Sequence, residues 1–150
     1  MNRRTLVTVL ALTALVAVVA IAVVARAGTP AASATPAPPL TGTTLQREAF
    51  DLALYRGKPT VVNFFASWCP ACASEAADIA AFAEAHPDVN VVGVAINDKR
   101  ADVQRFVYDY RLPYAIALDP KSGNADAWGV NGIPATFFLD DQGRTAREPM

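Results

Sequence analysis

The chain has 150 residues, 53% of them apolar and 18% charged, and its formal net charge is −1 at pH 7. A chain of this length accommodates one domain and an appendage. The near balance of charges gives no indication of a basic surface, so we expect no nucleic-acid partner.

An apolar run of 20 residues, Leu6 to Ala25, follows Arg3 and Arg4 near the N-terminus. It carries no charge, and it suits a membrane-spanning helix better than the apolar core of about 7 to 15 residues in a signal peptide. Because flanking arginines favour the cytoplasmic side, we expect the rest of the chain outside the cytoplasm. The alternative is a cleaved signal peptide, since Ala25-Arg26-Ala27 has the form of a cleavage site. Residues 1–27 are therefore predicted to be a single-pass anchor in the cell membrane, or a signal peptide of a secreted protein.

Residues 28–39 are rich in Pro and Ala and contain no large apolar side chain. Such a segment cannot bury enough surface to fold, and its prolines keep it extended. We expect a linker that holds the predicted domain, residues 40–150, near membrane partners and raises their effective concentration.

The first part of the domain, residues 40–54, predicts one or two short strands. Their inward-facing side chains are expected to be Leu45, Phe50, Leu52 and Leu54. After a turn at 56–59, the apolar run 60–66 is typical of a strand buried on both faces of a sheet. Asn63 is the polar exception in this run, and a buried amide needs a hydrogen-bonding partner.

The only two cysteines follow in Trp68-Cys69-Pro70-Ala71-Cys72, where the predicted strand passes into a helix. Cys69 falls at the N-cap and Pro70 at the first helical position, where a missing N–H costs no hydrogen bond. Free amides and the helix dipole favour a thiolate at Cys69, because thiols in such motifs have pKa values of about 3.5 to 7.5. Cys72 lies one turn later and can close a disulfide with Cys69. The pattern predicts a nucleophile and a resolving cysteine.

Two other interpretations of the cysteine pair are weaker. A structural disulfide that closes so small a loop adds little stability. A zinc site would have two cysteine ligands and the sole histidine, His86, as at most a third. We therefore expect redox chemistry without a metal or another cofactor.

After the cysteines, segments with helical spacing alternate with short apolar runs. We predict helices at 71–86, 99–111 and 124–128, strands at 91–96, 114–118 and 135–139, a loop at 129–134 and a turn at 140–143. Strands that alternate with helices indicate an α/β fold with a mostly parallel sheet and right-handed crossovers.

Two sequence motifs resemble those of a known protein family. Residues 61–72, VVNFFASWCPAC, match the active-site strand and turn of the thioredoxin fold, and residues 129–140, GVNGIPATFFLD, match the segment that carries its cis-proline. The chain from about residue 45 to residue 143 resembles the membrane-tethered, extracytoplasmic thioredoxin-like proteins of the TlpA, ResA and DsbE type. The resemblance implies a central mixed sheet flanked by helices.

The resemblance also assigns residues to roles. Pro134 would have a cis peptide bond after Ile133 and lie against the sulfurs, with the backbone of Ile133 exposed as an edge for a substrate chain. Glu75 would take the proton of Cys72 as that thiol attacks, although the helix dipole alone also favours an acid in the first turn. Trp68 would cover the disulfide and contact the substrate, or simply pack against the domain.

Other positions depart from the family pattern. Thioredoxin has a buried aspartate where this chain has Asn63, whose amide cannot relay a proton, so Asn63 and Pro70 are taken as tuning residues. Ala77 stands where the family usually has a proline, which predicts a weaker kink in the helix. The family continues with a last strand and a C-terminal helix, which we expect this sequence to lack, in part or wholly.

The predicted function is a membrane-tethered, extracytoplasmic thiol:disulfide oxidoreductase that reduces protein disulfides. By resemblance, its substrates include apocytochrome c during cytochrome c maturation, and a membrane thiol transporter supplies its electrons. Pro70-Ala71 matches neither the Gly-Pro of thioredoxin nor the Pro-His of strong oxidants, so a DsbA-like oxidant is the first alternative. A copper-binding module on the same fold is the second, but the loop around Pro134 contains no histidine or methionine ligand.

Overall fold

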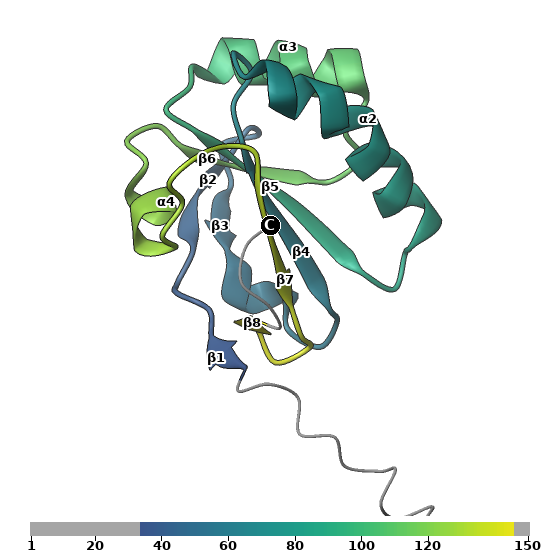
Figure 1. The fold of residues 1–150 in the computed structure, drawn as a ribbon, viewed down its shortest axis with the longest axis vertical. Coiled ribbons are helices and arrows are strands. Elements are labelled where there is room, and N and C mark those ends of the chain that lie inside the picture. Colours follow the sequence, from purple (N-terminus) through teal and green to yellow (C-terminus); the bar gives the residue numbers. More distant parts are fainter. Residues whose placement is uncertain (1–33, 146–150) are drawn as a thin grey trace, which may run out of the picture. The chain divides into compact units, whose positions relative to one another are not determined.

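A computed structural model describes residues 34–145, which form one sheet with helices packed against it (Figure 1). The elements in chain order are β1 (Thr35–Pro36), β2 (Thr41–Thr44), β3 (Ala49–Asp51), the 3-10 helix η1 (Leu52–Tyr55), β4 (Thr60–Phe65), α2 (Pro70–Ala85), β5 (Asn90–Ile96), α3 (Arg100–Tyr110), β6 (Ala115–Asp119), α4 (Gly123–Ala127), β7 (Ala135–Leu139) and β8 (Arg144–Thr145). The expected helices and strands from residue 60 onward are all present in the order predicted, with bounds that differ by at most one residue.

The strands are arranged in the order β1-β8-β7-β4-β5-β6-β2-β3. Only the central strands β4, β5 and β6 pair in parallel, and the other pairings among the described strands are antiparallel. The sheet is therefore mixed, as the resemblance implied. The prediction of a mostly parallel sheet from alternating elements was wrong, because the hairpin of β2 and β3 and that of β7 and β8 both lie antiparallel to the central strands that they join.

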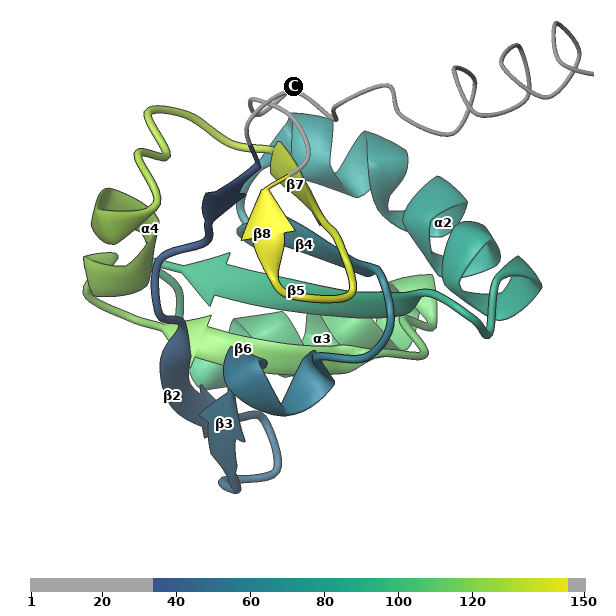
Figure 2. The same ribbon diagram turned by 90° about the horizontal axis from the view of Figure 1, so that it is seen from below.

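Strand β4 lies at the centre, and all six of its residues are buried, which confirms the expectation from its apolar run. Val62 and Phe64 face one core, where Phe64 packs against Trp128 and Phe137. Phe65 faces the other core, which contains both cysteines and residues of α2 and α3. Figures 1 and 2 show the two helices together on one side of the sheet, as right-handed crossovers between successive parallel strands require.

The N-terminal hairpin confirms part of the predicted core. Phe50 and Leu52 are buried, and Leu45 is half-buried, but Leu54 is 82% exposed, so its predicted inward position was wrong. The cause is the start of η1, where the Asp51 carboxylate accepts a hydrogen bond from Ala53 N at 2.9 Å. This cap turns the chain into a 3-10 helix, and the strand alternation that would have buried Leu54 ends there.

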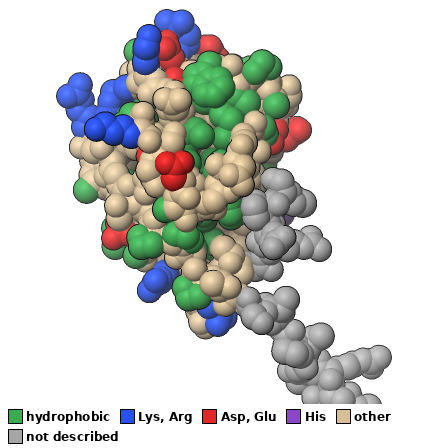
Figure 3. All heavy atoms as spheres, turned by 60° about the vertical axis from the view of Figure 1, so that its left-hand side comes forward, with side chains coloured by type: hydrophobic (Ala, Val, Ile, Leu, Met, Phe, Trp, Pro, Cys, Tyr) green, Lys and Arg blue, Asp and Glu red, His purple; other side chains and the backbone are tan. Residues whose placement is uncertain are grey.

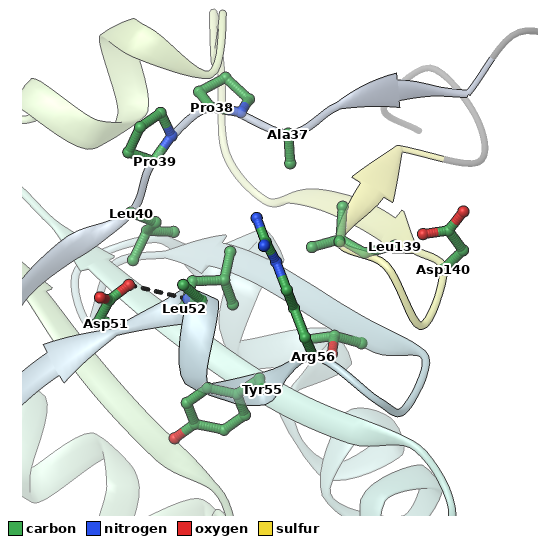
Figure 4. A pocket seen from close by; sticks show the side chains of 13 residues that line it. Ala37, Pro38, Pro39, Leu40, Asp51, Leu52, Tyr55, Arg56, Leu139 and Asp140 are labelled. Atoms are coloured by element: carbon green, nitrogen blue, oxygen red, sulfur yellow. Dashed lines mark hydrogen bonds between the residues drawn. The ribbon is translucent and has the colours of Figure 1, made fainter.

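The last residues of the expected linker belong to the folded part. Thr35 and Pro36 pair with β8, and Ala37 N donates a hydrogen bond to Gly143 O at 3.1 Å. Residues 37–40 then line a cavity of about 150 Å³, into which Figure 4 shows the side chain of Arg56 projecting. Residues 34–39 of the predicted linker thus take part in the described fold, while the predicted anchor at 1–27 and linker residues 28–33 lie outside the described residues. Within residues 34–145, no helix has the length and apolar character needed to cross a bilayer.

The surface carries charges of both signs. On the face shown in Figure 3, Lys and Arg side chains gather at the upper left with some Asp and Glu side chains near them, and apolar side chains gather at the upper right.

Candidate active site

The two cysteines lie at the N-terminal end of α2 and are joined by a disulfide, with their Cα atoms 5.3 Å apart. Cys69 is the N-cap residue, and Pro70 occupies the start of the helix, as the sequence predicted. The backbone N–H of Cys72 donates to Cys69 Sγ across 3.1 Å. Both residues are buried in this oxidised form, with exposed fractions of 5% for Cys69 and 2% for Cys72.

This geometry favours negative charge on one sulfur. The N-terminal amides of a helix carry partial positive charge and have no partners within the helix. The N–H of Cys72 already points at Cys69 Sγ, so a thiolate formed at Cys69 by reduction would be stabilised without rearrangement of the backbone. The arrangement can therefore supply a nucleophilic sulfur, with a second sulfur within bonding reach.

The loop before β7 brings a distant segment to the same place. The peptide bond between Ile133 and Pro134 is cis, as the resemblance implied. Cys69 Sγ lies 3.8 Å from the carbonyl oxygen of Ile133. Both loop residues are half-buried, so part of their surface is accessible beside the disulfide.

Asn63 lies behind the cysteines on β4 and has two partners. Its Nδ2 atom donates to Glu75 Oε1 at 2.9 Å and to Thr136 Oγ1 at 3.1 Å. Asn63 is thus a satisfied buried amide, as expected, and it links Glu75 on the helix to the strand that follows the cis-proline. Thr136 did not emerge from the sequence as a site residue, although it is the one polar residue in the apolar strand β7 and pairs in register with Asn63.

A tyrosine shares this region with Glu75. Burial raises the pKa of Tyr114, and the negative charge of Glu75 raises it further, so Tyr114 is a neutral phenol near the carboxylate. The ring of Tyr114 also approaches Gly93 on β5, where a Cβ atom would meet it at 3.3 Å.

On the other side of the cysteines, Trp68 is 60% exposed. Its indole Nε1–H donates to the carbonyl oxygen of Asn97 at 3.2 Å. The ring lines a groove of about 380 Å³ together with Phe106 and Tyr110 of α3. The exposed ring beside the disulfide suits a surface for substrate contact, and it argues against simple packing inside the domain.

Asp98 is a site-adjacent residue that the sequence did not reveal. Its carboxylate accepts hydrogen bonds from Ser67 N at 2.6 Å and from Ser67 Oγ at 3.1 Å. A signal was present, because Asn97 and Asp98 follow a strand predicted to run parallel to the cysteine strand, and the carboxyl ends of parallel strands meet at one edge. Among residues 34–145, no group of three or more His, Cys, Asp or Glu side chains is arranged to hold a metal ion.

The chain is similar to known proteins that have the same kind of site. The family model described as AhpC/TSA matches residues 34–147. The thiol:disulfide interchange protein DsbE of Allochromatium vinosum is 38% identical over 88 residues, which cover 58% of this chain and 48% of that protein. The thiol-disulfide oxidoreductase ResA of Geobacillus thermodenitrificans is 27% identical over 124 residues, or 79% of this chain and 70% of that protein.

A solved structure agrees with these relatives. It is a secreted disulfide oxidoreductase of Mycobacterium tuberculosis described as homologous to E. coli DsbE, and it superposes with a TM-score of 0.67 and 34% sequence identity. The match covers 71% of this chain and 79% of that one. The chain spans about half the length of the DsbE relative. By its fold, its cysteine pair and these matches, the chain belongs to the AhpC/TSA family of thioredoxin-like proteins, together with the DsbE and ResA thiol-disulfide oxidoreductases.

Proposed function

We propose that the chain is an extracytoplasmic thiol:disulfide oxidoreductase that reduces disulfides in other proteins. The observation that carries the oxidoreductase activity, in either direction of electron flow, is the environment of Cys69 Sγ, which lies 3.1 Å from Cys72 N and 3.8 Å from Ile133 O. The first contact stabilises a thiolate, and the second places that sulfur beside accessible backbone. Together they provide a nucleophile and a place for an extended substrate segment to dock.

The reaction follows from the positions of the two sulfurs. In the reduced protein, the Cys69 thiolate attacks one sulfur of a substrate disulfide, forms a new S–S bond and releases the other substrate sulfur as a thiolate. Cys72 then loses its proton and attacks Cys69 Sγ, which expels the second substrate sulfur. Two electrons pass from the cysteine pair to the substrate, and the protein is left with the Cys69–Cys72 disulfide that the structure contains.

Glu75 is the proposed acceptor of the Cys72 proton. It lies about one helical turn beyond Cys72, and its carboxylate accepts a hydrogen bond from Asn63, which fixes its direction. Asn63 cannot take the proton itself, because a neutral amide has no basic site of suitable strength. In this proposal Asn63 orients the carboxylate, and Glu75 is the group that changes its protonation state.

The wider setting is also a proposal. We infer that residues 1–27 anchor the domain to the outer side of the cell membrane, and that a membrane thiol transporter reduces the Cys69–Cys72 disulfide. Support comes from the arginine-flanked apolar run in the sequence and from the similarity to a secreted mycobacterial oxidoreductase. Apocytochrome c is the proposed substrate class, on the family resemblance of the two sequence motifs.

A second candidate keeps the chemistry and reverses the flow of electrons. The hydrogen bond from Cys72 N to Cys69 Sγ stabilises a thiolate and therefore the reduced form, and strongly stabilised reduced forms belong to oxidants. A DsbA-like protein would pass its disulfide to folding proteins and be reoxidised afterwards.

One measurement separates the two directions. The equilibrium between the cysteine pair and glutathione gives the reduction potential, for which a value near that of thioredoxin, about −270 mV, supports the reductant and one near about −120 mV supports the oxidant. Insulin reduction by the wild-type protein, with Cys69→Ser as control, tests the activity itself. Equal turnover by the two proteins would contradict the proposed function.

A further inference from the structure

Asp98 connects the end of β5 to the residue that precedes Trp68. Its Oδ2 atom accepts from Ser67 N at 2.6 Å, and its Oδ1 atom accepts from Ser67 Oγ at 3.1 Å and from Lys99 N at 2.7 Å. Asp98 and Ser67 are both half-buried, so water screens these contacts only in part. Hydrogen bonds to an ionised acceptor are stronger than those between neutral groups.

Asn97, the residue before Asp98, holds Trp68, the residue after Ser67. The carbonyl oxygen of Asn97 accepts from the indole Nε1–H of Trp68 at 3.2 Å. Asn97 is itself fixed, because its backbone N–H donates to Asp119 O at 3.1 Å. Two consecutive residues after β5 therefore hold the two consecutive residues that precede Cys69.

The position of the Trp68 ring depends on both contacts. The ring is 60% exposed, and with Phe106 and Tyr110 it lines the groove of about 380 Å³ beside the cysteines. Holding a large exposed side chain in one position costs conformational entropy, and two polar contacts offset that cost here: the indole hydrogen bond and the anchored backbone of Ser67. Without the Asp98 carboxylate, the backbone before Trp68 would lose its charged anchor.

We propose that Asp98 is a positioning residue that acts through Ser67 to fix the Trp68 ring at the groove, where a polypeptide substrate contacts the protein. Asp98 does not take part in the exchange of electrons or protons between sulfurs. The inference rests on the oxidoreductase activity proposed above, but it holds for either direction of electron flow. It predicts that Asp98 matters for large substrates and not for small disulfides.

The experiment compares full-length wild type with Asp98→Ala, Asp98→Asn and the control Asp78→Asn, which removes a charge from an exposed position on α2. Each protein is checked for folding by circular dichroism. We expect Asp98→Ala to raise the KM for insulin about tenfold with kcat within about threefold, and Asp98→Asn, which keeps one oxygen acceptor, to raise it about threefold. The reduced proteins should all react with the small disulfide DTNB within about threefold of wild type.

Two further readouts separate positioning from general loosening of the fold. Acrylamide quenching of tryptophan fluorescence should increase in Asp98→Ala, because a Trp68 ring that is no longer held is more accessible to the quencher. The change reports on Trp68, since the other tryptophan, Trp128, is buried. In a Trp68→Ala background, Asp98→Ala should change the KM for insulin less than twofold, since the ring that it positions is gone.

Three results would overturn the role of Asp98. They are an unchanged KM for insulin in both Asp98 variants, a loss of DTNB reactivity as large as the loss on insulin, and an undiminished effect in the Trp68→Ala background. If Asp98→Ala does not fold, Asp98→Asn decides the question by the same criteria. Absence of insulin turnover in the wild type would instead contradict the proposed function, so the two failures are distinguishable.

Discussion

The side-chain amide of Asn63 donates to the Glu75 carboxylate across 2.9 Å, from a buried position in the central strand to the second turn of the cysteine helix. An amide at this distance holds one carboxylate oxygen and leaves the other available to accept a proton. The pair thus divides into an orienting group and a titrating group, and the two functions can be tested separately.

Glu75→Gln should slow the resolving step while leaving the first attack unchanged. Glutamine can still accept the hydrogen bond from Asn63, but it cannot take the Cys72 proton, and loss of a general base costs typically about 100-fold or more. Rapid-quench alkylation should show the mixed disulfide accumulating with a peptide disulfide substrate. Glu84→Gln, at an exposed position on the same helix, should behave as wild type. Equal resolving rates in Glu75→Gln and wild type would remove Glu75 from the mechanism.

Asn63→Asp should alter the pH dependence. It would place two carboxylates within hydrogen-bonding distance, and such pairs share a proton because both cannot ionise easily. One apparent pKa of the pair should rise, so that the pH profile of insulin reduction moves to higher pH. Asn63→Ser, which introduces no charge, serves as the control. A profile that does not move in Asn63→Asp would show that the carboxylate of Glu75 is not in the rate-determining proton transfer.

Cys72→Ser should trap the substrate. Cys69 retains the hydrogen bond from the backbone N–H of residue 72, which does not depend on the side chain, so the first attack proceeds and the mixed disulfide persists. Cys69→Ser should form no such adduct. Non-reducing electrophoresis after incubation with an oxidised protein substrate distinguishes the two, and adducts of equal yield in both variants would contradict the assignment of the nucleophile.

Gly93→Ala should destabilise the domain by about 1–3 kcal/mol, the usual cost of overpacking a core. A Cβ atom on Gly93 would lie 2.6 Å from Ile116 Cδ1 and 3.0 Å from Phe65 Cε1. Gly123→Ala is the matched control, because a Cβ atom there meets nothing within 4 Å. Urea unfolding measures both free energies, and equal values for the two variants would show that the core beside the cysteines can relax.

Asp140 should make the turn between β7 and β8 sensitive to acid. The backbone N–H of Arg144 is the main cause that lowers the pKa of Asp140, and the Arg144 side chain adds to it at 2.8 Å. A carboxyl whose pKa is lowered by folding stabilises the protein above its unfolded pKa of about 3.9 and loses that contribution as the pH falls through the folded value. The difference in Tm between wild type and Asp140→Asn should therefore shrink below about pH 4. A difference that is constant from about pH 2 to about pH 6, or one that Asp141→Asn reproduces, would contradict this.

Much of the fold could be predicted because the apolar runs, turn residues and helix-start signals in the sequence favour the same elements that the tertiary structure contains. The bounds of β7 were predicted as observed, since its apolar run ends at a turn with Asp140 and Gly143, and Gly143 has a φ of 75°. The positions of Cys69 and Pro70 followed from the rules for helix N-termini, which act over a few residues.

The contacts that the sequence did not predict depend on the register between strands. Asn63 meets Thr136 because β4 and β7 pair with these residues opposite each other, and a shift of one residue would turn Thr136 to the other face. Asp98 reaches Ser67 because β4 and β5 pair Phe65 with Ala95, so that the following residues leave the sheet together. Spacing within one segment does not determine such pairings, and this is why Thr136 and Asp98 were missed.

The pairing of β1 with β8 places Ala34 at the end of the sheet opposite to the cysteines. Thr145 lies opposite Leu139, and Leu139 lies opposite Thr60, the first residue of β4, whereas Cys69 follows the last. Ala34, the first described residue, therefore lies near the end of β4 that is opposite to Cys69. A tether joined at Ala34 would therefore enter the domain at the end of the sheet away from Cys69, which leaves the disulfide at the opposite end accessible to a protein substrate.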